Sequence, residues 1–177
     1  MQVRRAKSQD AESIRQVYRH AFSPAERNTV AALAVELLLA ETRPASFALL
    51  AAVNGDVAGH IAFTPVFPDT KQQWQGYILA PLGVHPAHQG KGIGAALLKS
   101  GIHLLQQQQA DILFVYGDPA YYCKFGFSTD AALNYTPPHA LHYPLGWQAT
   151  PLRAAFEPAG APVPIRCVQP LNVPELL

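Results

Sequence analysis

The stretch that decides the fold runs Leu82-Gly83-Val84-His85-Pro86-Ala87-His88-Gln89-Gly90-Lys91-Gly92-Ile93-Gly94-Ala95. The apolar residues before Pro86 are typical of a strand, and the apolar residues after Gly94 recur at helical spacing. Glycines at positions 90, 92 and 94 allow tight turning, so that several backbone N–H groups can point at one site. The N-terminus of the following helix adds partial positive charge there. The stretch therefore predicts a strand, an anion-binding turn and the start of a helix.

Other classes of glycine-rich loop fit this stretch less well. A nucleoside-triphosphate loop is excluded, because Gly92 stands at the hydroxyl position and His85 at the first glycine. A dinucleotide loop could use Gly90, Gly92 and Ala95 with Asp111 as the ribose ligand, but Asp111 precedes the next strand, whereas the ribose-binding acid belongs at the far end of that strand. A glycine-rich connection without a ligand remains the alternative.

The pattern of apolar residues predicts the order strand, helix, helix, three strands, helix, strand and helix. Ser8 is expected to cap the first helix, and Asn54-Gly55 to make the tight turn between the first two of the three strands. After Thr136 prolines become dense, which predicts irregular structure with short strands laid on the sheet. The expected elements cover residues 3–5, 8–18, 26–39, 47–53, 57–66, 75–84, 94–108, 112–116 and 119–124.

Composition predicts one domain over residues 1–177, since 177 residues with 49% apolar content suffice for one core. The net charge is +1 and the basic residues are scattered, which argues against nucleic-acid or membrane partners. Cys123 and Cys167 are too few for a disulfide scaffold. With no secretory signal and no apolar stretch of spanning length, the expected location is the cytoplasm.

A second motif runs Gly117-Asp118-Pro119-Ala120-Tyr121-Tyr122-Cys123-Lys124-Phe125-Gly126-Phe127. It resembles Y-x-x-x-G-F, the second motif of the GNAT superfamily of N-acetyltransferases, whose loop pattern [QR]-x-x-G-x-[GA] is matched by Gln89, Gly92 and Gly94. It also resembles the G-D-P-x-Y-Y-x-x-F-G-F form of a bacterial subfamily of mostly predicted acetyltransferases. The resemblance covers residues 3–127 as a GNAT-like core, and residues 128–177 form a divergent, proline-rich part.

The resemblance implies an α+β fold with a mixed, mostly antiparallel central sheet flanked by helices, in which a splayed strand pair holds acetyl-CoA. It implies acetyl-CoA as cosubstrate and no metal. The Val84 N–H would donate to the thioester carbonyl, and Lys91 is either a further charge for the phosphates or a solvated loop residue. The cofactor-binding residues carried over are Leu82, Val84, Gln89, Gly90, Lys91, Gly92, Ile93, Gly94 and Ala95.

Tyr122 stands where the family places a general acid, which would protonate the departing CoA thiolate. A thiol of pKa ~8.5 facing a phenol of pKa ~10 makes this transfer uphill by ~2 kcal/mol. We expect the N-terminus of a short helix to lower the pKa of the Tyr122 phenol. The alternative is an aromatic residue packed on the sheet, a role better suited to Tyr121.

Attack by an amine also needs a base, and by chemistry alone His60, His85 and Glu36 are open candidates. His85 and His88 have a metal-like spacing but no third ligand nearby. Cys123 is expected to be a small buried thiol rather than a nucleophile.

The function expected is an acyl-CoA-dependent N-acyltransferase that moves an acetyl group to a primary amine of a small molecule or protein. The alternative is a non-catalytic acyl-CoA-binding regulatory module. The two N-terminal helices and the C-terminal part are expected to line the acceptor side. Possible aromatic walls are Phe22, Phe67, Tyr135 and Trp147.

Overall fold

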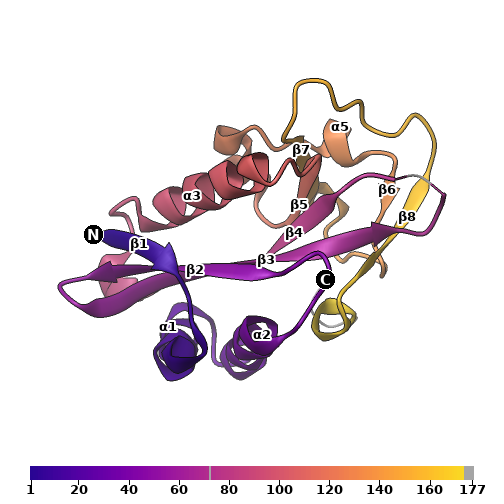
Figure 1. Ribbon diagram of the computed structural model, residues 1–177. Helices are drawn as coiled ribbons and strands as arrows, with labels where there is room; N and C mark the ends of the chain where they lie inside the picture. Colours follow the sequence, from indigo (N-terminus) through magenta and orange to yellow (C-terminus); the bar gives the residue numbers. More distant parts are fainter. Residues whose placement is uncertain (72, 174–177) are drawn as a thin grey trace. The chain divides into compact units, whose positions relative to one another are not determined.

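The computed structural model describes residues 1–71 and 73–173 (Figure 1). The order of elements predicted up to Phe127 is confirmed, with ends that differ by one to a few residues. The elements are β1 (Gln2–Arg5), α1 (Ala11–Ala21), α2 (Arg27–Leu39), β2 (Phe47–Val53), β3 (Asp56–Pro68), β4 (Gly76–Val84), α3 (Ile93–Gln107), β5 (Ile112–Tyr116), α4 (Pro119–Tyr122), α5 (Thr129–Ala132), β6 (Tyr135–Thr136), β7 (Trp147–Pro151) and β8 (Val163–Cys167).

The start of the first helix differs from the prediction. Ser8 does not cap α1; it begins a 3-10 turn, Ser8–Asp10, and α1 starts only at Ala11. The Asp10 carboxylate accepts from the Lys7 N–H at 2.8 Å and from both terminal nitrogens of Arg4. A charge-assisted carboxylate is a stronger acceptor than a serine hydroxyl, so Asp10 organises this turn.

The chain divides into two compact units, of which the first comprises Met1–Phe63 and Ala80–Gly101. In it β1 and β2 pair antiparallel, and so do β2 and the first part of β3. The turn between β2 and β3 has positive φ at Asn54 (54°) and Gly55 (95°), as the Asn-Gly signal predicts. The helices α1 and α2 pack on each other through a cluster of buried residues: Ile14, Tyr18, Ala31 and Ala34.

The helix α3 packs closely against β3 at two glycines. A Cβ on Gly101 of α3 would lie 2.0 Å from the Phe63 ring, and a Cβ on Gly59 of β3 would lie 2.9 Å from Ile93. Phe63 is itself held by stacking on Phe47, with ring centroids 4.9 Å apart. The close approach of helix and strand therefore needs glycine at both contacts.

The second unit comprises residues 64–79 and the chain from 102 onward. The first part of β4 pairs parallel with β5, β5 pairs antiparallel with β7, and the end of β3 pairs antiparallel with β8. The pairing is thus mixed and mostly antiparallel, as expected. No helix among residues 1–71 and 73–173 is long and apolar enough to cross a membrane.

The part after Thr136 is more regular than predicted. All of β7 pairs with β5, from Trp147 opposite Tyr116 to Pro151 opposite Ile112. The sequence of β7 alternates apolar and polar residues, but burial does not follow that alternation, because Gln148 and Thr150 are buried as well as Trp147 and Ala149. The Gln148 amide is satisfied there by donating to the backbone carbonyls of Gly117 and Gly146.

Candidate functional site

The glycine loop lies in the first unit between β4 and α3, as predicted. A 3-10 turn, Pro86–His88, follows the strand, and the chain then passes Gly90 and Gly92 with φ of +74° and +78°. No atom lies within 4 Å of a Cβ built on either glycine. Glycine is therefore required at both positions because of the positive φ, which residues with an L side chain rarely adopt.

The loop exposes a run of backbone donors. Among the described residues, no group accepts a hydrogen bond from the N–H of any residue from Gly90 to Ala95. The first bond of α3 is donated by Ala96 to the Gly92 carbonyl at 3.0 Å. Successive free amides at the start of a helix, in an exposed loop, form a site for an anion such as a phosphate.

The polar side chains of the loop are occupied within it. The Gln89 amide donates to the Val84 carbonyl at 3.0 Å, and the Lys91 ammonium donates to the Ala87 carbonyl at 2.9 Å. His85 Nδ1 accepts from the Ala87 N–H at 3.3 Å. The binding groups that the loop offers are thus mainly its backbone amides.

The end of β4 presents backbone groups at one edge. The His85 N–H donates to the Ala58 carbonyl of β3 at 2.8 Å. Successive residues of a strand direct their N–H groups to opposite edges, which places the Val84 and Leu82 amides on the edge away from β3. The pairing of β4 with β5 ends at Leu79, before these residues.

Tyr122 is the last residue of α4, in the second unit. Its side chain is 9% exposed, and its ring packs at 5.0 Å from Tyr121 and 5.6 Å from Phe127, measured between centroids. Asp118 caps α4 by accepting from the Ala120 N–H at 2.9 Å. No described residue hydrogen-bonds the Tyr122 hydroxyl, which leaves that group available.

The expected lowering of the Tyr122 pKa is wrong. Burial, with smaller contributions from Tyr121 and Asp118, raises the pKa of this phenol well above its ordinary value. The physical reason is that burial penalises the charged phenolate, and α4 offers no compensation because it is one turn of 4 residues with Tyr122 at its last position. Burial also raises the pKa of Tyr121.

The three candidate bases differ in environment. His60 is fully buried, which lowers its pKa to about 3, and its Nδ1 lies 2.9 Å from the Tyr18 hydroxyl. His85 uses Nδ1 as an acceptor, so in the neutral ring the proton sits on Nε2. Glu36 is exposed on α2. His60 is inaccessible and His85 presents a donor, so neither arrangement favours a base.

The structure also shows the surroundings of Cys123 and of the two histidines with metal-like spacing. Cys123 is exposed, which corrects the expectation of a buried thiol, because the 3-10 turn after α4 turns it to solvent. The His85 and His88 rings lie 6.1 Å apart. In the described part of the chain, no group of three or more His, Cys, Asp or Glu residues could hold a metal ion.

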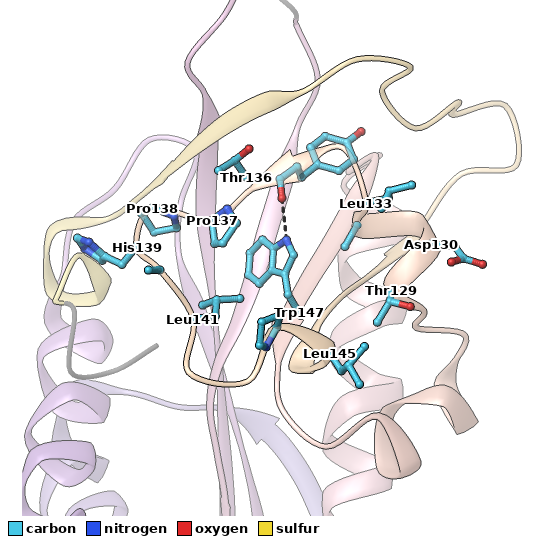
Figure 2. A pocket seen from close by; sticks show the side chains of 14 residues that line it. Thr129, Asp130, Leu133, Thr136, Pro137, Pro138, His139, Leu141, Leu145 and Trp147 are labelled. Carbon is cyan, nitrogen blue, oxygen red and sulfur yellow. Dashed lines mark hydrogen bonds between the residues drawn. The ribbon is translucent and has the colours of Figure 1, made fainter.

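The predicted aromatic walls have different local surroundings. Tyr135 and Trp147 line a cavity of about 670 Å³ in the second unit, where the Trp147 indole donates to the Tyr135 carbonyl at 2.8 Å (Figure 2). Phe22 instead packs against the buried cluster of α1 and α2. Phe67 lies on β3 opposite Arg166 of β8 and does not line this cavity.

Sequence reasoning missed the contact between Tyr18 and His60. In the sequence Tyr18 fits the apolar spacing of the first helix, yet in the structure its hydroxyl contacts His60, 42 residues further along the chain. No local pattern signals such a pair, because each residue fits its own element without the other.

Comparison with known proteins agrees with these features. Residues 11–127 match the model of the family described as acetyltransferase (GNAT) family. The chain is 33% identical over 165 residues to the uncharacterized N-acetyltransferase YjhQ of Escherichia coli, covering 91% of this chain and 88% of that protein.

Solved structures share the fold. A GNAT family N-acetyltransferase of Escherichia coli, YhbS, in complex with CoA, superposes with a TM-score of 0.82 at 24% identity, covering 97% of this chain and 92% of that one. A GNAT family acetyltransferase from Brucella melitensis in complex with acetyl-CoA gives a TM-score of 0.67 at 29% identity, covering 96% and 97%. The predicted fold class is confirmed.

Proposed function

The chain belongs to the acetyltransferase (GNAT) family, and on that premise we propose that it moves an acetyl group from acetyl-CoA directly to a primary amine. The family assignment makes it an acetyl-CoA-dependent N-acetyltransferase. The amine belongs to a small molecule or a protein, and no observation favours the non-catalytic alternative. We also propose that the chain belongs to the bacterial subfamily with the G-D-P-x-Y-Y-x-x-F-G-F motif. Residues 1–177 would then act as one catalytic domain.

The free amides from Gly90 to Ala95 are the observation that carries this proposal. They would bind the pyrophosphate of acetyl-CoA by main-chain donation at the start of α3. Gln89 would act by holding the Val84 carbonyl, and Lys91 by closing the loop on Ala87. The acetyl-CoA bound to the Brucella melitensis relative supports this choice of ligand.

Leu82 and Val84 would hold the pantetheine arm and the thioester through their backbone groups. The amide of Val84 lies on the edge of β4 away from β3, as a donor to the thioester carbonyl requires. That oxygen gains negative charge as the amine attacks, so a fixed N–H dipole stabilises the transition state more than the ground state.

Tyr122 would donate a proton to the CoA sulfur as the carbon–sulfur bond breaks. Its raised pKa keeps the hydroxyl protonated at neutral pH, so the acid form is always present. The raised pKa also makes this phenol a weaker acid, which makes transfer to the thiolate more uphill. Desolvation raises the pKa of the departing thiol as well, which offsets part of that cost.

The proposal is tested by measuring binding and turnover separately. Acetyl-CoA should raise the melting temperature of the protein, whereas NADH and ATP should not. A panel of amines and peptide N-termini with detection of released thiol then identifies the acceptor. A protein that binds acetyl-CoA but acetylates nothing in the panel would favour a binding module. A cytoplasmic location stays a prediction.

A further inference from the structure

Tyr18 of α1 is completely buried and makes contacts that its place in a helix does not require. Its hydroxyl lies 3.0 Å from the Pro81 carbonyl of β4, 2.9 Å from His60 Nδ1 and 3.2 Å from the His60 carbonyl of β3. One side chain from outside the sheet thus reaches two adjacent strands.

The direction of these hydrogen bonds follows from the chemistry of His60. The buried imidazole is neutral, since burial lowers its pKa to about 3, and therefore carries one proton. With that proton on Nδ1, His60 donates to the Tyr18 oxygen, and Tyr18 donates to the Pro81 carbonyl. This tautomer leaves only an unprotonated Nε2 without a partner, which costs less than an unpaired buried N–H.

The Tyr18 ring also rests on the backbone of β4. A Cβ built on Gly83 would lie 2.7 Å from Cε1 of Tyr18, so only glycine admits the ring at this point. Pro81 has no N–H with which to pair in the sheet, which leaves its carbonyl as the backbone hydrogen-bonding group there. Tyr18 therefore holds β4 by a hydrogen bond at Pro81 and by packing at Gly83, on either side of Leu82.

We propose that Tyr18 is a positioning residue that orients the backbone from Pro81 to Val84, so that the Val84 amide points at the thioester carbonyl. This inference rests on the proposed acetyl-CoA site. The pyrophosphate would be held by the backbone amides from Gly90 to Ala95, a different segment from Pro81–Val84, so we expect CoA binding to be independent of the Tyr18 hydroxyl.

The test compares Tyr18→Phe with Tyr77→Phe. Tyr77 is another buried tyrosine, near the start of β4, and its hydroxyl accepts a hydrogen bond from Gln75 at 3.4 Å. Both changes remove one buried hydroxyl and keep the ring, but only Tyr18 touches the segment proposed to bind the thioester.

The readout is the ¹³C resonance of acetyl-CoA labelled at the acetyl carbonyl, measured free and bound. In the wild type a hydrogen bond should polarise the carbonyl and move its resonance downfield. In Tyr18→Phe the bound resonance should return toward that of free acetyl-CoA while the affinity for CoA, which has no acetyl carbonyl, stays unchanged. Turnover with an amine should fall about 5- to 30-fold, the factor for one or two kcal/mol. Tyr77→Phe should keep the wild-type resonance.

If the bound resonance is the same in Tyr18→Phe and wild type, the proposed role of Tyr18 is wrong, while the proposed acetyl-CoA site is unaffected. A wild type that binds no acetyl-CoA would overturn the proposed function and this inference together. If Tyr18→Phe does not fold, Gly83→Ala tests the same contact from the strand side with the hydroxyl retained. It should shift the resonance in the same direction, and a wild-type resonance there would also refute the inference.

Discussion

The ring of Tyr122 lies directly against the backbone of Gly117, where a Cβ would stand 2.6 Å from Cε2 of the tyrosine. Gly117 is the residue that follows β5, so this contact fixes the ring of the proposed acid to the end of a buried strand. A side chain at position 117 could be accommodated only if the ring moved.

Gly117→Ala should therefore lower turnover by displacing the Tyr122 hydroxyl. The overpacking should cost about 1–3 kcal/mol of stability, measured by urea denaturation. Gly160→Ala is the matched control, because no atom lies within 4 Å of a Cβ at that position. Wild-type turnover in Gly117→Ala would show that the exact position of the ring is unimportant.

Tyr122→Phe should lower kcat by ~10²- to 10⁴-fold and leave acetyl-CoA affinity nearly unchanged, because it removes a proton donor and keeps the ring. Tyr121→Phe should change kcat a few-fold at most. Since burial raises the pKa of Tyr122, kcat should show no loss of this acid at neutral pH and only a decline at high pH. If Tyr122→Phe turns over normally with chemistry rate-limiting, the tyrosine is structural.

Gly92→Glu should abolish the rise in melting temperature that acetyl-CoA produces, because a carboxylate would stand among the amides proposed to bind the pyrophosphate. Gly55→Glu is the control for the backbone strain that glutamate causes at a residue with positive φ. Gly55 has φ of 95°, as unfavourable for glutamate as the 78° of Gly92, and a Cβ at either site meets nothing within 4 Å. Both variants should lose similar stability, and only Gly55→Glu should keep the ligand effect.

His60 should make stability depend on pH below neutrality. Its pKa is about 3 in the folded protein against an ordinary 6.5, so between these values the unfolded chain binds a proton that the folded protein does not. Its contribution to stability is complete above pH 6.5 and is lost as pH falls toward 3, by at most ~1.4 kcal/mol per pH unit.

His60→Asn cannot titrate, so it should remove the contribution of His60 to the pH dependence of the unfolding free energy. The other titratable groups should contribute equally in variant and wild type. The measurement is the free energy of unfolding in urea at several values between pH 6.5 and pH 4.5. Identical slopes in variant and wild type would mean that His60 gains a proton in the folded protein.

The features predicted correctly from the sequence are those that depend on neighbouring residues. The Asn54-Gly55 turn and the loop glycines Gly90 and Gly92 have the positive φ that their residue types suggest. The helix from Ile93 and the strand Ile112–Tyr116 follow from apolar spacing alone. For this reason the backbone conformation of the glycine loop could be predicted from the sequence.

The features that were missed depend on tertiary burial. The pKa of Tyr122 rises because of what surrounds the ring, and neither the length of α4 nor the depth of burial is visible in the sequence motif. The pairing of Tyr18 with His60 needs the packing of α1 on the sheet. The polar residues of β7 are buried because the fold supplies partners for Gln148 that the strand itself does not suggest.

The seat of Gly101 on Phe63 has a consequence for how variants of this protein are interpreted. Gly101 follows the first residue of α3 by about two turns, roughly 12 Å along the helix axis. Any larger residue would push α3 off β3 and carry the free amides at its N-terminus with it. A genetic screen would then classify the substitution as a ligand-contact defect, although the residue never touches ligand. The tolerance of this helix to natural variation is thus set by a contact about two turns away from the amides proposed to bind ligand.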